Sequence, residues 1–182
     1  VEVNCLALER ELRAGTYQPG GYRTFFIRDP KPRVISAAPF RDRVVHHALC
    51  AEIEPALERG AASESFACRR GKGMLAALQH TRRLARGFHF SLKLDVRHFF
   101  QTARHDILRR LLRRRIRDPE LTWLIGRILD AGAPGSPPGL GLPIGNLTSQ
   151  HFANFYLGPV DRLVRRELRP GGYCRYMDDM LL

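Results

Sequence analysis

Hydrophobic residues recur along this chain with two different periods, and the longer period predicts helices. Four stretches carry an apolar residue at every third or fourth position, which gives a helix one buried face, and they are residues 41–57, 74–84, 104–117 and 152–168. A further helix should follow Asp118 and run to about Ala131, because Asp caps helices and Pro119 suits the first turn. The pair Gly158-Pro159 should kink the last helix.

The shorter period, an alternation of apolar and polar residues, predicts strands. Residues 22–28 and 33–37 are rich in aromatic and β-branched residues on either side of a basic turn, so they should pair as a hairpin. Residues 88–96 alternate along their whole length and predict the clearest strand of the chain. Asp95 lies on the polar face of that strand, near its end.

A second hairpin is predicted at the end of the chain. Residues 173–177 and 180–182 flank Asp178-Asp179, which gives a strand, a tight turn and a strand. Ahead of the last helix, residues 132–146 form a loop of about fifteen residues that is rich in Gly and Pro. A loop of that length inside a compact domain is expected to have a function.

Three carboxylates acquire a chemical meaning only when they are taken together. Singly, Asp95 or the pair Asp178-Asp179 is more typical of structure than of function, because Asp is a favoured turn residue and helix cap. If their strands are neighbours in one sheet, the three side chains meet, repel one another and need cations. Oxygen ligands select Mg²⁺, and two such ions about 3.5–4 Å apart can hold both the attacking and the leaving oxygen of a phosphoryl displacement.

The composition narrows the class of protein. The chain has 182 residues, 44% of them hydrophobic, which is enough for one domain with its own core and excludes global disorder. Lys and Arg number 30 against 18 Asp and Glu, a net charge of +12, and only three of the basic residues are lysines. Because a guanidinium group donates two parallel hydrogen bonds to phosphate and stacks on bases, nucleic acid is the first partner to consider.

Membrane insertion, export and zinc binding find no support. No apolar stretch reaches the ~20 residues of a membrane span, and the start of the chain has neither an initiator Met nor the layout of a secretory signal, so it looks like a cut edge. The four cysteines lie far apart without a zinc-type spacing. We therefore expect reduced cysteines in a cytoplasmic protein with no membrane partner.

Four motifs resemble, in their order along the chain, those of reverse transcriptases, and they lie at residues 26–35 with 38–43, 92–100, 141–150 and 175–179. The resemblance covers about residues 22–182. It implies an α/β (α+β) fold with a small antiparallel palm sheet and flanking helices. Residues 1–182 would form a single unit without the thumb, in which the fingers comprise approximately 1–87 and 103–147 and the palm 88–102 and 148–182.

The resemblance also implies individual roles. Catalysis would rest on Asp95, Asp178 and Asp179, and the same residues with Val96 would bind two Mg²⁺ ions, for which Mn²⁺ can substitute. Phe100, five residues after the first Asp, would reject the 2′-hydroxyl of the incoming nucleotide. The other nucleotide-binding residues would be Arg28, Lys31, Arg33, Pro143, Ile144, Gly145 and Gln150.

Nucleic acid would be bound at two places. Tyr176 and Met177 are implied by the resemblance. The helix at 104–117 carries seven arginines against one acidic residue, so a phosphate-binding face and a merely solvated face are equally compatible with its composition. The arginines proposed to bind phosphate are Arg109, Arg110, Arg113 and Arg114. The expected partners are an RNA template, a DNA or RNA primer, dNTPs and an accessory protein of the retroelement.

The loop motif points to a subgroup. Most reverse transcriptases resemble a Gln-Gly…Ser-Pro pattern where this chain has Ile144-Gly145-Asn146, a variant similar to the enzymes of diversity-generating retroelements in bacteria and phages, which copy template adenines with errors. Ile144 cannot form the hydrogen bond of the usual Gln, so discrimination near the nascent base pair should be lower. The alternatives are a retron or group II intron-type reverse transcriptase, and a non-catalytic truncated RNA-binding remnant.

Overall fold

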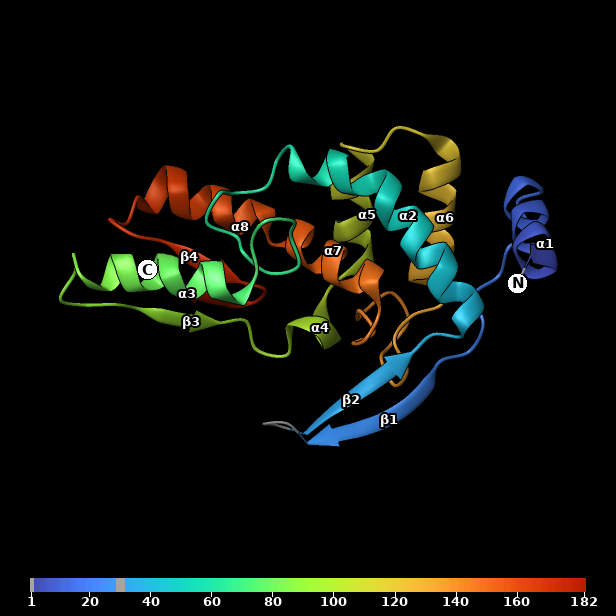
Figure 1. Cartoon of the computed structure of the whole chain (residues 1–182), viewed down its shortest axis with the longest axis horizontal. Helices are drawn as coiled ribbons and strands as arrows, with labels where there is room; N and C mark the ends of the chain where they lie inside the picture. Colours follow the sequence, from blue (N-terminus) through green and yellow to red (C-terminus); the bar gives the residue numbers. More distant parts are fainter. Residues whose placement is uncertain (1, 29–31) are drawn as a thin grey trace.

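The computed structural model describes residues 2–28 and 32–182, so Lys31 lies outside the described residues. These residues form helices packed around two small antiparallel sheets (Figure 1). In chain order the elements are α1 (Glu2–Arg13), β1 (Arg23–Arg28), β2 (Pro32–Ala37), α2 (Phe40–Glu58), α3 (Met74–Ala85), β3 (Lys93–Asp95), α4 (Phe99–Thr102), α5 (His105–Arg113), α6 (Pro119–Asp130), α7 (Leu147–Tyr156), α8 (Gly158–Leu163), the π-helical segment η1 (Val164–Leu168), β4 (Cys174–Tyr176) and β5 (Asp179–Leu181). This mixture confirms the predicted α/β class.

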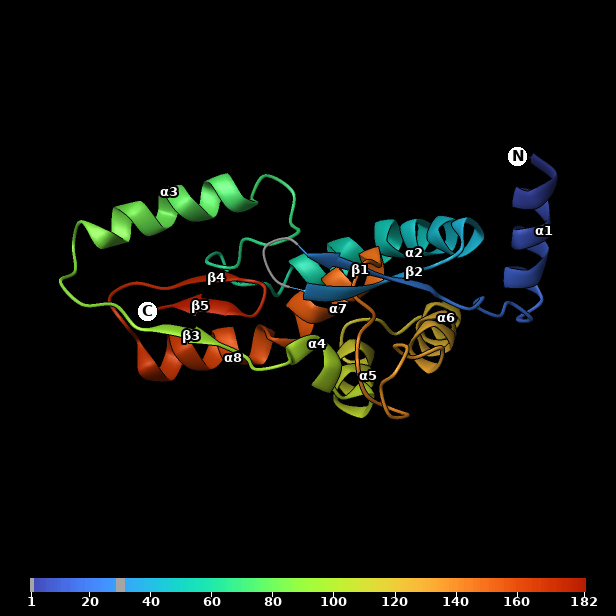
Figure 2. The same cartoon turned by 90° about the horizontal axis from the view of Figure 1, so that it is seen from below.

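The two sheets have separate surroundings. β1 and β2 form a two-stranded antiparallel hairpin in which Ile27 lies opposite Arg33. The second sheet has the order β3-β5-β4, so β5 is its central strand and pairs with both neighbours. Figure 2 shows this sheet between α3 on one side and α8 on the other.

The main core lies between the helices. α2 packs along α7, and the buried side chains of this contact include Ile53 of α2 and Phe152 of α7, each 1% exposed. Leu108 of α5 and Ile128 of α6 belong to the same cluster. The helical hydrophobic spacing therefore predicted correctly the buried faces of α2, α5 and α7, because these faces bury apolar area against a neighbour. It was wrong for α3, where Met74, Leu75 and Leu78 are 64%, 70% and 50% exposed.

The helix boundaries follow local signals. At the start of α6, Asp118 accepts a hydrogen bond of 2.8 Å from the backbone N–H of Leu121, as its position before Pro119 predicted. The predicted kink at Gly158 is also confirmed, because α7 ends at Tyr156 and α8 begins at Gly158. No helix was predicted from the sequence at the position of α1.

Two strand predictions need correction. The strand expected at 88–96 is regular only over Lys93–Asp95, and Phe90 is 92% exposed. Its partner β5 ends at Leu181, and the last pairing joins Leu92 to Leu182 through two hydrogen bonds of 2.9 and 3.0 Å. Alternation alone does not make a strand where no partner supplies hydrogen bonds.

The turn of the second hairpin is also shifted by one residue from its predicted position. It consists of Met177 and Asp178, and Asp179 is already the first residue of β5. A separate result concerns membranes: among residues 2–28 and 32–182, no helix has the length and apolar character to span one.

Candidate active site

The β4–β5 turn holds its acidic residue on a strained backbone. Met177 has a φ of +55°, in the left-handed region that glycine usually occupies at the first central position of a two-residue hairpin turn. A non-glycine residue keeps such a conformation only where its surroundings hold it. The turn that presents Asp178 is therefore held by contacts with residues outside the turn.

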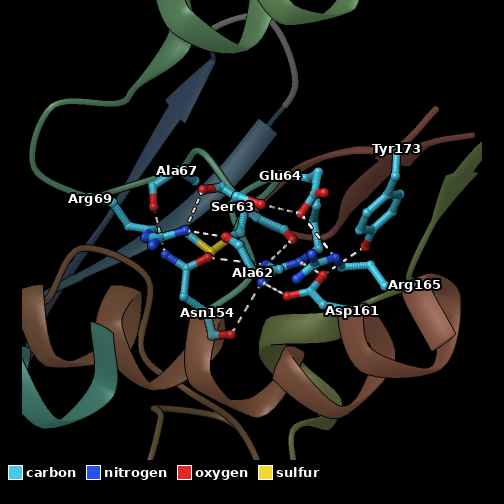
Figure 3. Close-up of polar contacts among 12 residues, drawn as sticks. Ala62, Ser63, Glu64, Ala67, Arg69, Asn154, Asp161, Arg165 and Tyr173 are labelled. Carbon is cyan, nitrogen blue, oxygen red and sulfur yellow. Dashed lines mark hydrogen bonds and ion pairs between the residues drawn. The ribbon is translucent and has the colours of Figure 1, made fainter. Parts of the chain in front are cut away.

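The restraint comes from Arg175, which is 1% exposed. Its guanidinium group donates a hydrogen bond of 2.9 Å to the carbonyl oxygen of Met177 and two of 2.7 Å to the carboxylate of Asp161. The Tyr173 hydroxyl donates to the same carboxylate at 2.7 Å, and Figure 3 shows it directed toward Asp161. A buried ion pair is tolerated where its polar atoms are satisfied in this way, so the turn is tied to α8.

The antiparallel register brings the carboxylates of two strands together. Asp179 of β5 lies opposite Asp95 of β3 on one side and opposite Tyr176 of β4 on the other. Side chains in such opposite positions are direct neighbours on one face of a sheet. Lys93 places its Nζ 3.2 Å from Oδ1 of Asp179, and among residues 2–28 and 32–182 no ion pair is formed by Asp95.

Asp178 experiences both burial and like charge. Burial raises the pKa of its carboxyl, the charges of Asp95 and Asp179 raise it further, and the nearby Arg33 guanidinium lowers it. Arg33 belongs to β2, so a charge on the two-stranded hairpin acts on the acidic turn of the other sheet. The structure thus brings together Asp95, Asp178, Asp179 and Arg33 from residues far apart in the sequence.

A complete protein cage for a metal is not formed. Over the described residues 2–28 and 32–182, no group of three or more His, Cys, Asp or Glu side chains is arranged to hold an ion. The oxygen donors of Asp95, Asp178 and Asp179 nevertheless suit Mg²⁺ or Mn²⁺. Such ions are commonly bound through one or two carboxylates, several waters and the phosphates of a substrate.

The glycine-containing loop docks on the hairpin. The carbonyl oxygen of Ile144 accepts a hydrogen bond of 2.7 Å from the backbone N–H of Ser36 in β2. Gly145 has a φ of +114°, and a Cβ there would lie 2.9 Å from the Ile35 side chain. Only glycine allows this approach. Asn146 adds a hydrogen bond of 3.3 Å from Nδ2 to the Ser36 carbonyl oxygen.

The remaining residues predicted to form the nucleotide site differ in their exposure. Phe99 is 3% exposed and belongs to the core, while Phe100 is half-buried, with its ring centroid 5.5 Å from that of Phe99. Val96 packs partly against the core. Pro143, Ile144 and Gln150 are half-buried, and Gly145 and Arg28 are exposed.

The predicted arginines of α5 do not share one surface. Arg109 forms an ion pair of 2.6 Å with Asp130 of α6. Arg113 lines a groove between α5 and α6, whereas Arg114 lines a separate cavity of about 310 Å³ between α2, α5 and α7. Arg110 is exposed. The helix therefore presents its charges in several directions.

Sequence reasoning missed the polar network behind the turn. Arg175 was noted only as part of a motif, and Asn154 and Asp161 were not singled out. The available signal was the position of Asp161, a carboxylate within the apolar pattern of residues 152–168, and it is 1% exposed. A charge on the buried side of a helix implies a buried partner.

Comparison with known proteins agrees with this arrangement. The family described as reverse transcriptase (RNA-dependent DNA polymerase) matches residues 28–182. The chain is 26% identical to the putative COX1/OXI3 intron 1 protein of Saccharomyces cerevisiae, over 85% of this chain and 19% of that protein. It is also 26% identical to the group II intron-encoded protein LtrA of Lactococcus lactis subsp. cremoris, over 85% of this chain and 27% of that protein.

Two further likenesses extend the comparison. Protein YkfC of Escherichia coli is 24% identical over 96% of this chain and 57% of its own length, so the chain spans 19% to 57% of these relatives. A chain of the partial Cas6-RT-Cas1–Cas2 complex shares the fold, with a TM-score of 0.57 at 23% identity over 99% of this chain and 32% of that one. The family match covers most of the sequence, and the chain therefore belongs to the reverse transcriptase (RNA-dependent DNA polymerase) family.

Proposed function

We propose that this chain carries the catalytic centre of an RNA-directed DNA polymerase. The observation that supports this most strongly is the pairing of Asp95 with Asp179 in adjacent strands, beside Asp178 on a restrained turn. An RNA template, a DNA or RNA primer and dNTPs are the substrates that go with this function. The division into fingers and palm suggested by the sequence belongs to the same proposal.

The chemistry divides between ions and side chains. Two Mg²⁺ ions, or Mn²⁺ in their place, would activate the primer hydroxyl and neutralise the charge that develops on the phosphates. Asp95, Asp178 and Asp179 would hold them, with Val96 beside the site. Because the carboxylate form binds the cation, the raised pKa of Asp178 means that falling pH weakens metal binding at a higher pH than for an ordinary Asp.

The residues around the carboxylates would position the nucleotide. Arg33 lies close enough to influence Asp178 and would bind the triphosphate, since guanidinium groups pair with phosphate in bidentate geometry. Phe100 would restrict the sugar, and the docked loop with Ile144 would border the base pair. Arg28, Lys31, Pro143, Gly145 and Gln150 complete the proposed nucleotide site, and Tyr176 and Met177 the primer contact.

Two subgroups are supported by different observations. The Ile144-Gly145-Asn146 sequence favours a diversity-generating retroelement with error-prone synthesis. The relative named as a group II intron-encoded protein favours an intron-type enzyme. Ile144→Gln separates them: in the first case misincorporation opposite template adenine falls, because a hydrogen-bonding side chain is restored, and in the second it stays unchanged. An accessory protein of the retroelement would be an additional partner in the first case.

The polymerase function is tested by primer extension on an RNA template with Mg²⁺. The chain should add dNMP residues weakly and distributively, and Asp178→Asn should lower the rate at least 100-fold while RNA binding is retained. The matched control is Asp106→Asn, which removes an exposed carboxylate on α5. Equal rates for Asp178→Asn and the unaltered chain would favour the remnant that binds RNA without catalysis.

A further inference from the structure

A cationic groove separates α5 from α6, outside the acidic site. It has a volume of about 720 Å³ and is lined on one side by Arg109 and Arg113 and on the other by Trp123 and Arg127. Arg117 lies in the connection between the two helices. Figures 1 and 2 place α5 and α6 side by side toward the end of the molecule that carries α1, and the three-stranded sheet toward the other end.

One of these arginines is part of the groove wall. Arg109 pairs with Asp130 at 2.6 Å and donates a hydrogen bond of 3.3 Å to the Gly126 carbonyl oxygen. A Cβ on Gly126 would lie 3.2 Å from Nη1 of Arg109, so this glycine gives the guanidinium group room along α6. Asp130 is the one carboxylate among the lining residues, and it is used by this pair.

Three arginines of the groove are available to bind a ligand. Arg113 and Arg117 are exposed, and Arg127 is half-buried with a single weak hydrogen bond of 3.4 Å from Nε to the Tyr17 carbonyl oxygen. Within the part of the chain that the structure describes, the ion pairs formed involve none of these three residues. Three uncompensated guanidinium groups around one groove favour a ligand with several phosphates.

Trp123 supplies a flat apolar surface among these charges. It is half-buried, packs against the core and lines the groove. Grooves that bind single-stranded nucleic acid combine cations that follow the backbone with aromatic rings on which bases stack. A paired duplex keeps its bases inside, so the combination of arginines and an indole favours an unpaired strand over a duplex.

We propose that the α5–α6 groove binds a single-stranded nucleic acid, with phosphates at Arg113, Arg117 and Arg127 and one base stacked on Trp123. The binding does not depend on catalysis. That the strand is the unpaired part of the RNA template rests on the proposed function. RNA and DNA share the phosphates and bases that the groove would bind, so both are tested.

The chain contains its own probe, because Trp123 is its only tryptophan. Titration with a ten-nucleotide oligo(U) or oligo(dT) at low salt should quench the tryptophan fluorescence, since a stacked base lies against the indole. Heparin carries negative charge without bases and should not quench it. Equal quenching by heparin, or by an acidic polyglutamate, would overturn the proposal and indicate a general polyanion or acidic-peptide site.

Variants test the two halves of the groove separately. The triple substitution of Arg113, Arg117 and Arg127 by Gln should flatten the slope of log affinity against log salt by about 2, because each phosphate contact on a single strand contributes about 0.7. The control removes three exposed arginines of α3 and the residue after it, Arg82, Arg83 and Arg86. It should leave the fluorescence quenching of Trp123 unchanged.

Trp123→Leu should weaken oligonucleotide binding, measured by fluorescence anisotropy of a labelled strand, about tenfold, whereas Trp123→Phe should keep most of it. Circular dichroism would show that each variant is folded. If the triple variant binds with the parental slope, or if folded Trp123→Leu binds as tightly as Trp123→Phe, the groove is not a nucleic-acid site. Binding of oligo(U) and oligo(dT) with the same affinity identifies phosphate and base as the recognised groups, whereas tighter oligo(U) binding identifies RNA.

Discussion

Arg175 donates a hydrogen bond of 2.9 Å to the carbonyl oxygen of Met177, the residue whose left-handed backbone shapes the turn. The same guanidinium group is paired with Asp161 inside the protein. The position of Asp178, one residue further, is therefore set by a buried ion pair behind the turn.

The first prediction concerns this buried pair. Asp161→Asn should destabilise the protein by about 3 kcal/mol in urea unfolding, because it leaves the Arg175 charge buried without compensation. Arg165→Gln breaks the exposed pair with Glu64, 3.4 Å long, and should cost less than about 1 kcal/mol. Similar losses for the two variants would mean that the buried pair does not hold the turn.

The second prediction concerns the loop that docks on β2. Gly145→Ala should destabilise the chain and weaken dNTP binding, because the new Cβ meets Ile35 at 2.9 Å on a backbone with a φ of +114°. Gly135→Ala is the matched control, since Gly135 also has a positive φ, +79°, but nothing lies within 4 Å of its Cβ position. Equilibrium unfolding and nucleotide titration of both variants measure the difference. Equal effects would show that the contact with Ile35 is unimportant.

The third prediction concerns the charge of Asp178. Burial and two neighbouring carboxylates raise its pKa and Arg33 lowers it, so Arg33→Gln should raise the pKa further. Carbon-13 NMR of the aspartate carboxyls over a pH series measures this directly. Arg23→Gln removes the same charge at the other end of the hairpin and should leave the Asp178 titration unchanged. A titration unaffected by Arg33→Gln would show that the Arg33 charge does not act on the Asp178 carboxyl.

The fourth prediction is that the charge of Asp178, which metal binding requires, lowers the stability of the folded protein. A carboxyl whose pKa is raised in the folded protein stabilises the folded state only while it is protonated. As the pH rises above 3.8, the ordinary pKa of Asp, this stabilisation is lost. Asp178→Asn should therefore raise the melting temperature at pH 7, by about 1–3 °C if the relief is below 1 kcal/mol. The gain should disappear near pH 3. A lower melting temperature at pH 7 would show that the carboxylate has a favourable partner in the folded protein.

The sequence predicted those elements whose signal is local. α6 was predicted because Asp118 and Pro119 act within one turn, and the helices of the core because their apolar spacing is sufficient to define a buried face. The strand expected at 88–96 is regular only where β5 lies opposite it, because the hydrogen bonds of a strand come from a partner, here a distant segment. The sequence of a strand does not by itself identify the segment with which it pairs.

In the candidate site, too, the sequence predicted residues with a local signal and missed those that depend on distant contacts. Asp95, Asp178 and Asp179 were found from their positions at strand ends and from a family resemblance, and the register brings their strands together. The network of Arg175 and Asp161 was missed because it joins a helix to a strand through burial. The apolar spacing of residues 152–168 indicates that Asp161 is buried, but it does not identify Arg175 on a separate strand as its partner.

The most direct test of the central claim is binding of Mn²⁺, measured by the electron paramagnetic resonance signal of the free ion in the presence of a dNTP. Asp95→Asn and Asp178→Asn should each weaken Mn²⁺ binding at least about tenfold, because each removes an oxygen ligand beside the nucleotide phosphates. Asp106→Asn should bind Mn²⁺ like the unaltered chain. Mn²⁺ affinity unchanged by Asp178→Asn would contradict the assignment of this acidic turn as a polymerase metal site.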